Sequence, residues 1–156
     1  MGTYFLDTSA LVKRYVTEVG QDWVNRLFQR DAGNTLIISQ ATLAEAVAAF
    51  CAKARASDIS ETERDRIIAL FRGEARRLCR LERVTTAIYT FAGDLCRMHR
   101  LRAYDAVQLA CAITVRDKLT SLGVTPTFVT AVTADRELLS VASLEGLLTD
   151  DPNIHP

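Results

Sequence analysis

The sequence predicts an α/β fold, a three-layer α/β/α sandwich with a central parallel sheet. One observation behind this prediction is that short, apolar, β-branched runs such as TLIIS (35–39) alternate with longer segments whose apolar residues recur at helical spacing. A second is that the strand-like runs read as buried, which is typical of parallel sheets covered by helices on both faces. The third is size, since 156 residues of which 49% are apolar suit one compact domain.

The first half of the chain is expected to supply two strands and four helices. The run TYFLD is apolar up to its last residue, and the segment after it places Leu11, Val12 and Tyr15 at helical spacing. A Ser-x-x-Glu capping box, Ser60 to Glu63, begins a long charged helix. The expected elements are a strand at 3–7, a helix from about Ser9, a helix over 20–31, a strand at 35–39, a helix over 40–54 and a helix over 60–80.

The second half continues the alternation of strands and helices. Its expected elements are a strand through Val84, a helix through Tyr89, Phe91 and Leu95, a helix over 103–119, a strand at about 127–131, a helix over 133–143 and a short strand within 144–150. Residues 1–149 are therefore expected to form a single domain, followed by a C-terminal tail, 150–156. In that tail Asp150 and Asp151 lie next to Pro152 in a polar, turn-like sequence, which predicts exposure to solvent.

Composition excludes several classes of protein. The formal net charge is zero, from 19 basic and 19 acidic residues, so no overall basic field indicates a nucleic-acid-binding protein, although a local basic rim stays compatible with one. The four cysteines form no CxxC pair, and with only two histidines they predict no structural zinc site. No charged leader with an apolar core opens the chain and no apolar run reaches membrane length, so we expect a cytoplasmic protein without a membrane segment.

Four acidic residues lie in surroundings that do not balance their charge. Asp7 ends an apolar strand, and Asp135 follows another strand by a few residues. Glu45 and Asp105 are each the only charged residue of an apolar stretch, ATLAEAVAAFCA and AYDAVQLACAI. In a parallel α/β sheet, residues just past strand ends and at the starts of the following helices share one edge. Three of the four acids are expected at that edge, whereas no clear strand precedes Asp105.

Each acid also has a structural explanation. Asp7 and Asp135 would suit helix caps, which the helix dipole favours. That explanation suits Glu45 and Asp105 less well, because a lone carboxylate in such apolar surroundings would have a raised pKa or would need a cation. Four carboxylates at one edge would repel one another unless a cation held them. Oxygen-only ligands with no Cys or His nearby suit Mg²⁺ or Mn²⁺, ions that activate water for attack on a phosphodiester.

Four sequence blocks resemble those of the PIN domain, the metal-dependent ribonuclease fold used by toxins of the VapC type. YFLDTSALVKRY resembles the opening block, LAEAVAAF the second, LRAYDAVQLA the third and VTADREL the fourth. They occur in the expected order and at compatible distances, over nearly the whole chain. The third block is the most distinctive, and it fits at Leu101, Arg102, Asp105, Ala106, Leu109 and Ala110.

The resemblance implies a role for each site residue. Asp7 and Asp105 would be the principal ligands of Mg²⁺ or Mn²⁺, and Glu45 and Asp135 would complete the acidic pocket by direct ligation, through water or by holding a second ion. Supporting hydroxyl and guanidinium groups, which would orient carboxylates or water or contact phosphate, would come from Thr8, Ser9, Thr133 and Arg102. The reaction would be hydrolysis of an RNA phosphodiester by metal-activated water, with no side-chain nucleophile.

The resemblance also implies a biological setting, the toxin of a type II toxin–antitoxin pair that acts as a homodimer and is silenced by a cognate antitoxin. Two alternatives stay open: a non-catalytic PIN-fold binding module, and a housekeeping PIN ribonuclease without an antitoxin. A phosphatase of the haloacid-dehalogenase type would also place an Asp at a strand end. It requires a second Asp two positions further on, where this chain has Ser9.

Overall fold

A five-stranded parallel sheet forms the middle layer of the molecule. The computed structural model describes residues 1–124 and 128–155. The strands lie in the order β3-β2-β1-β4-β5, and every neighbouring pair is parallel. The predicted α/β class with a central parallel sheet is therefore confirmed. The strands are β1 (Thr3–Leu6), β2 (Thr35–Ser39), β3 (Arg80–Glu82), β4 (Val129–Val132) and β5 (Leu148–Asp150).

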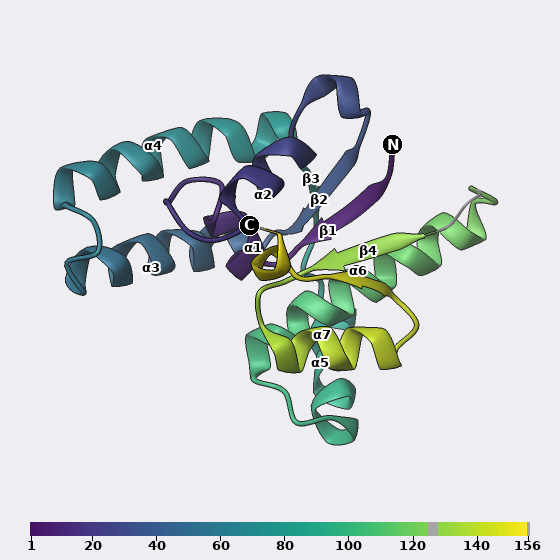
Figure 1. The fold of residues 1–156 in the computed structure, drawn as a ribbon. Helices are drawn as coiled ribbons and strands as arrows, with labels where there is room; N and C mark the ends of the chain where they lie inside the picture. Colours follow the sequence, from purple (N-terminus) through teal and green to yellow (C-terminus); the bar gives the residue numbers. More distant parts are fainter. Residues whose placement is uncertain (125–127, 156) are drawn as a thin grey trace.

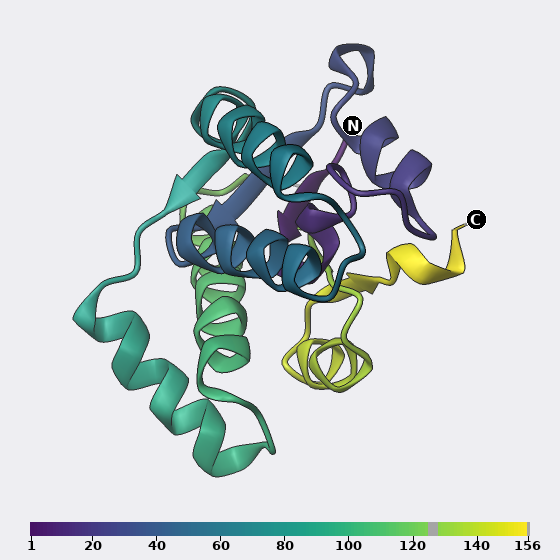
Figure 2. The same ribbon diagram turned by 90° about the vertical axis from the view of Figure 1, so that its left-hand side faces the viewer.

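Helices cover both faces of this sheet, which completes the predicted three layers (Figures 1 and 2). One face carries α1 (Thr8–Val12), α2 (Gln21–Leu27), α3 (Thr42–Arg55) and α4 (Glu61–Leu78). The other carries α5 (Thr86–Met98), α6 (Ala103–Ser121) and α7 (Arg136–Leu144). Two short 3₁₀ helices are η1 (Arg30–Ala32) and η2 (Pro152–Ile154).

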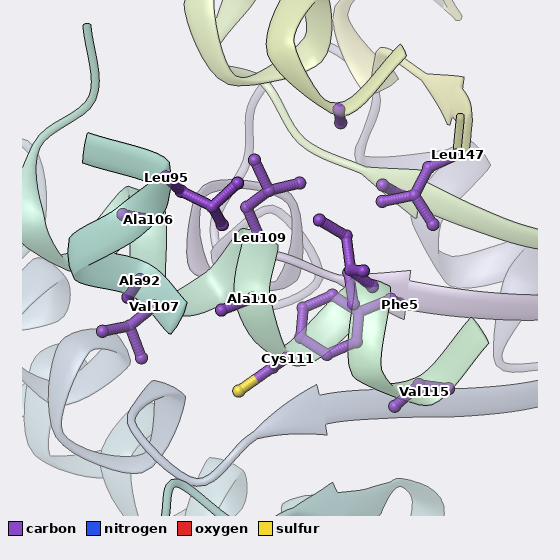
Figure 3. Packing of buried hydrophobic residues seen from close by; sticks show 14 of the residues in the cluster. Phe5, Ala92, Leu95, Ala106, Val107, Leu109, Ala110, Cys111, Val115 and Leu147 are labelled. Atoms are coloured by element: carbon purple, nitrogen blue, oxygen red, sulfur yellow. The ribbon is translucent and has the colours of Figure 1, made fainter. Parts of the chain in front are cut away.

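Strand side chains alternate between two hydrophobic cores. In β1, Phe5 packs into the core beneath α5, α6 and α7 (Figure 3). Leu6, the next residue, packs into the core beneath α1, α3 and α4. Strand β4 divides in the same way, with Val129 and Ala131 in the first core and Val132 in the second. Burial on both faces explains why these strands read as apolar runs rather than as alternating polar and apolar residues.

Helix α6 is the central helix of its face, and every residue from Ala106 to Ile113 is buried. Residues 122–128 alone separate α6 from β4, and α6 packs against that strand. A helix so closely followed by a parallel strand has to run antiparallel to the strands of the sheet. The first turn of α6 therefore lies at the carboxyl edge of the sheet.

Several predicted boundaries differ from the observed ones. The first helix ends at Val12, earlier than its apolar spacing predicts. Beyond it the chain continues as turns, in which the Arg14 and Tyr15 N–H groups donate to the carbonyls three residues back, at 3.1 and 3.0 Å. The strand expected through Val84 lies instead at Arg80–Glu82, where it pairs with β2. Of the strand expected at 127–131, residue 127 lies outside the described residues, and β4 extends to Val132.

Asp150 and Asp151, for which the sequence predicts exposure to solvent, are both half-buried. Asp150 ends strand β5 and accepts a hydrogen bond from His155 at 2.7 Å, while Asp151 caps η2. The His155 ring stacks on Trp23 with the centroids 4.3 Å apart and the planes 3° from parallel. Local sequence does not indicate this contact, since its two rings lie at opposite ends of the chain.

The C-terminal segment also approaches the backbone near α2. Gly20 has φ +87°, and a Cβ atom at this position would lie 2.1 Å from the Pro152 carbonyl oxygen. Only glycine allows both this left-handed backbone and this close approach. No helix in the described ranges 1–124 and 128–155 combines the length and the apolar character that a membrane crossing needs.

Candidate active site

The four acids singled out by the sequence line one open depression at the carboxyl edge of the sheet. Strands β1 and β4 are neighbours in the sheet, but the helices that follow them, α1 and α7, pack on opposite faces. Divergence of this kind opens a crevice outside the strand ends, where ligands of parallel α/β proteins bind. The carboxylates come from four separate elements and face this crevice from the ends of β1 and β4 and the first turns of α3 and α6.

Asp7 is held rigidly at the centre of the crevice. It is 8% exposed and caps α1, and its Oδ2 accepts hydrogen bonds from the Ser9 backbone N–H at 3.2 Å and the Ser9 hydroxyl at 2.6 Å. The Thr133 hydroxyl donates to the same oxygen at 2.9 Å. Three donors on one oxygen fix the carboxylate and leave Oδ1 without a donor from the residues that the structure describes.

Glu45 is held in the same way, through one of its two oxygens. Its Oε2 accepts hydrogen bonds from the Thr8 hydroxyl at 3.0 Å and from Gln108 Nε2 at 2.5 Å. Burial raises the pKa of Glu45 above its ordinary value, although these two hydrogen bonds oppose the rise. The nearby charges of Asp7 and Asp105 raise it further.

Asp135 and Asp105 share one cation. Asp135 caps α7, with its Oδ1 accepting from two backbone N–H groups, those of Glu137 at 2.8 Å and Leu138 at 3.0 Å. Its Oδ2 lies 3.5 Å from the Arg102 guanidinium, which also lies 3.5 Å from Asp105 Oδ2. Burial raises the pKa of Asp105, Arg102 opposes the rise, and the charges of Asp135 and Asp7 add to it.

The geometry therefore brings together all the residues that the sequence singled out. The supporting side chains contact the acids directly. Thr8 donates to Glu45, Ser9 and Thr133 donate to Asp7, and Arg102 lies between Asp105 and Asp135. Asp7 and Asp135 also cap helices, so their structural explanation and a role in a site are compatible.

The donor atoms of the depression fit a hard divalent cation. Every candidate ligand is an oxygen, two carboxyl groups have raised pKa values, and Arg102, whose side chain is 82% exposed, is the cation paired with Asp105 and Asp135. Within residues 1–124 and 128–155, no three His, Cys, Asp or Glu side chains already converge tightly enough to hold an ion. The carboxylates thus share a crevice without closing around a single point.

Sequence reasoning missed one residue that supports Glu45, Gln108. Gln108 is 1% exposed, and its Nε2 contacts the hydroxyls of Thr8 at 3.2 Å and Thr42 at 3.0 Å besides the Glu45 carboxylate. Its Oε1 is buried with no partner among the described residues. A signal was available, since Gln108 is the one polar residue in the buried run from Ala106 to Ile113 and follows Asp105 by three positions.

A lysine–glutamate cluster, formed by Lys13, Glu18 and Lys53, lines the same depression. Lys13 Nζ lies 3.4 Å from Glu18 Oε2, and the Lys53 ammonium contacts the other oxygen of Glu18. Lys13 lies within the opening block, YFLDTSALVKRY, but the sequence alone does not indicate a role for it. Two of the three lysines of the chain thus lie beside the acids, which gives the depression a cationic side.

Comparisons with known proteins bear on the family and the fold of the chain. The model of the family described as PIN domain matches residues 4–144. The ribonuclease VapC45 of Mycobacterium tuberculosis is 33% identical over 120 residues, which cover 75% of this chain and 79% of that protein. Among solved structures, VapBC2 from Rickettsia felis bound to a promoter DNA fragment is similar with a TM-score of 0.62 and 15% identity, over 96% of this chain and 98% of that chain. VapC20 of M. tuberculosis, described as a toxin that cleaves the sarcin–ricin loop, gives a TM-score of 0.60 and 17% identity, over 98% and 99%.

Proposed function

This chain belongs to the PIN domain family, and from that premise we propose that it is a metal-dependent endoribonuclease that hydrolyses RNA phosphodiester bonds. One observation carries the proposal: carboxylates from four separate elements, Asp7, Glu45, Asp105 and Asp135, line one crevice at the carboxyl edge of the sheet. Such an unbalanced set of acids suits a site that receives a cation together with an anionic substrate.

We assign Asp7 and Asp105 as the principal ligands of Mg²⁺ or Mn²⁺, with Glu45 and Asp135 completing the acidic pocket. When bound, such an ion lowers the pKa of water and stabilises the leaving oxygen of an in-line displacement. The protein contributes orientation. Donors of the protein hold one oxygen of each of Asp7, Glu45 and Asp135, and the other oxygen would serve the ion, with Arg102 as its competitor at Asp135.

The rim of the crevice suits a polyanion. Arg102 is exposed and flexible enough to exchange its carboxylate partners for a phosphate, because its contacts at 3.5 Å are long. On the other side, Lys13 and Lys53 outnumber Glu18 by one positive charge. Basic groups beside an acidic centre position a phosphodiester backbone without reading its sequence.

The biological role follows from the same family. The chain is the toxin of a type II toxin–antitoxin pair in this proposal, as its VapC relative suggests, with RNA as its substrate and a cognate antitoxin as its partner. We further propose that it acts as a homodimer in the cytoplasm, and that residues 1–149 make up the nuclease domain.

The direct test is incubation of the purified chain with bacterial total RNA and Mg²⁺ or Mn²⁺. We expect cleavage that EDTA abolishes and that Asp7→Asn abolishes as well. Asn is as good a helix cap as Asp, so this variant removes the charge and keeps the fold. Expression in bacteria is expected to arrest growth for the wild type and not for Asp7→Asn.

The outcomes separate the alternatives. If the wild type and Asp7→Asn are equally harmless and neither cuts RNA, the chain is a binding module and the proposal fails. If the wild type cuts RNA with a divalent ion but does not arrest growth, the nuclease assignment stands and the toxin assignment gives way to a housekeeping ribonuclease.

A further inference from the structure

Gln108 is a buried residue whose packing does not account for its amide group. Its side chain contacts Thr8, Thr42 and Glu45 through Nε2, whereas Oε1 has no partner in the described part of the chain. A buried carbonyl oxygen without a hydrogen bond is unfavourable. An apolar side chain of similar length, such as methionine, would fill the same space without that penalty.

We propose that Gln108 is a positioning residue for Glu45, whose carboxylate it holds by one oxygen so that the other stays available in the crevice. The inference rests on the proposed function, since it assigns Gln108 to the same metal-dependent site. It goes beyond the four acids and their hydroxyl partners, because Gln108 does not itself line the crevice and reaches it only through Thr8 and Glu45.

Hydrogen-bond capacity supports this assignment. The amide nitrogen has two hydrogens, and the contact with Glu45 Oε2, at 2.5 Å, is its shortest. The Thr8 hydroxyl donates to the same oxygen at 3.0 Å. With two donors from different elements on one oxygen, the carboxylate has little freedom to rotate away.

The position of Gln108 in the fold gives this contact a second consequence. Gln108 follows Asp105 by one turn of α6, and Glu45 lies in the first turn of α3 on the opposite face of the sheet. The amide therefore links α3 and α6, the helices that carry Glu45 and Asp105, at the point where both reach the carboxyl edge. A loss of this link is expected to let Glu45 turn away from Asp105.

The test is the pair of variants Gln108→Met and Ile113→Met. Both lie on the buried part of α6, and Ile113 belongs to the hydrophobic core away from the crevice lining. Binding of Mn²⁺ alone is measured by the electron paramagnetic resonance of the free ion, with thermal unfolding and RNA cleavage alongside. For Gln108→Met we expect Mn²⁺ binding about 10-fold weaker or more, as is typical when a hydrogen-bond partner of a metal ligand is lost, with an unfolding temperature that is unchanged or higher. Ile113→Met should leave Mn²⁺ affinity unchanged.

The same substitution made in a Glu45→Ala background separates a positioning role from a packing role. If Gln108 acts through Glu45, adding Gln108→Met to Glu45→Ala should weaken Mn²⁺ binding by less than about twofold, because the two effects share one carboxylate. Wild-type affinity in Gln108→Met, or an equal loss with and without Glu45, would overturn the inference. A wild type that neither binds Mn²⁺ nor cuts RNA would instead overturn the proposed function, so the two failures are distinguishable.

Discussion

Two clusters of charged side chains are withdrawn from water in this protein, and they are balanced differently. In the Arg14–Glu74 cluster, the guanidinium donates to both Glu74 oxygens, at 3.0 and 3.2 Å, and the Tyr15 hydroxyl donates to the same carboxylate at 3.1 Å. Arg14 also donates to Asn25 at 3.1 Å and lies 4.2 Å from the ring centroid of Phe28. The positive charge of Arg14 is therefore balanced by the negative charge of Glu74, through a hydrogen bond to each carboxylate oxygen.

The second cluster, the acidic edge, consists of Asp7, Glu45, Asp105 and Asp135, and its negative charges are not balanced in this way. Four carboxylates face the crevice, and the guanidinium that pairs with two of them is mostly exposed to solvent. Burial and mutual repulsion raise the pKa values of Glu45 and Asp105. The comparison teaches that a buried charge alone does not mark a functional site, whereas a cluster whose charge the protein leaves uncompensated does. Mutations should therefore affect stability in one cluster and activity in the other.

The largest effect is expected from Asp105→Asn, which removes a charge from the acidic edge. RNA cleavage should fall by about two to three orders of magnitude, the loss typical of removing one electrostatic contact to the reacting groups. Stability should stay unchanged or rise slightly at neutral pH, because one repelling carboxylate is gone. Initial cleavage rates and urea unfolding measure the two quantities. A variant that unfolds more easily and cuts RNA normally would reverse the assignment of this cluster.

Glu74→Gln makes the corresponding change in the Arg14–Glu74 cluster, and its effect should be on stability. The two side chains are 18% and 13% exposed, so a loss of the charge leaves a largely buried guanidinium uncompensated. We expect the free energy of unfolding to fall by about 3 kcal/mol. Urea denaturation measures it, and the folded fraction should cleave RNA at the wild-type rate. A stability loss below about 0.5 kcal/mol would mean that Arg14 finds another partner.

The placement of the acids follows from the sequence to different extents. Asp7 and Asp135 were predictable because each follows an apolar strand, and parallel strands end at the same edge. Among the described residues, no strand immediately precedes Asp105. Its position follows instead from the direction of α6, which runs antiparallel to the strands because β4 follows it closely, so that its first turn lies at the carboxyl edge. The short connection to β4 could have indicated this.

Other features had an ambiguous local signal or none. Gln108 has a polar side chain in an apolar run, which reads equally well as packing, and only the approach of α3 gives its amide a function. Arg14 and Glu74 lie 60 positions apart, so no pattern within either segment announces their pairing. The stacking of His155 on Trp23 is equally remote in sequence. The predicted elements were largely right because propensity and periodicity are local, whereas these contacts depend on tertiary packing.

Stability should respond to pH with one sign at Glu45 and Asp105 and with the opposite sign at Glu18. The pKa values of Glu45 and Asp105 are raised in the folded state, so protonation favours folding, and the stability they contribute is lost as the pH rises from about 4 toward neutrality. Glu18, whose pKa is lowered chiefly by Lys53 and Lys13 against the effect of burial, contributes stability that is lost as the pH falls.

Urea unfolding without metal, from pH 7 to pH 5, measures the contribution of Glu45. The stability of Glu45→Gln relative to the wild type should be greatest at pH 7 and shrink as the pH falls. Saturating Mn²⁺ should remove this trend, because the ion takes the place of the protons. If the stability of Glu45→Gln relative to the wild type instead grew toward pH 5, the folded protein would stabilise the charged form of Glu45.

The smallest effect is expected from Arg102→Ala. The side chain is 82% exposed and its contacts with Asp105 and Asp135 are long, so stability should change by less than about 0.5 kcal/mol. Because Arg102 competes with an added cation for the same two oxygens, Mn²⁺ should bind a few-fold more tightly to the variant at low salt, while the KM for RNA rises. The matched control is Arg97→Ala, whose 85% exposed side chain pairs with Asp94 on α5, and it should change neither quantity. Weaker Mn²⁺ binding in Arg102→Ala would show that the guanidinium holds the acids in place for the ion, and the acidic edge would then be more balanced than its pKa values indicate.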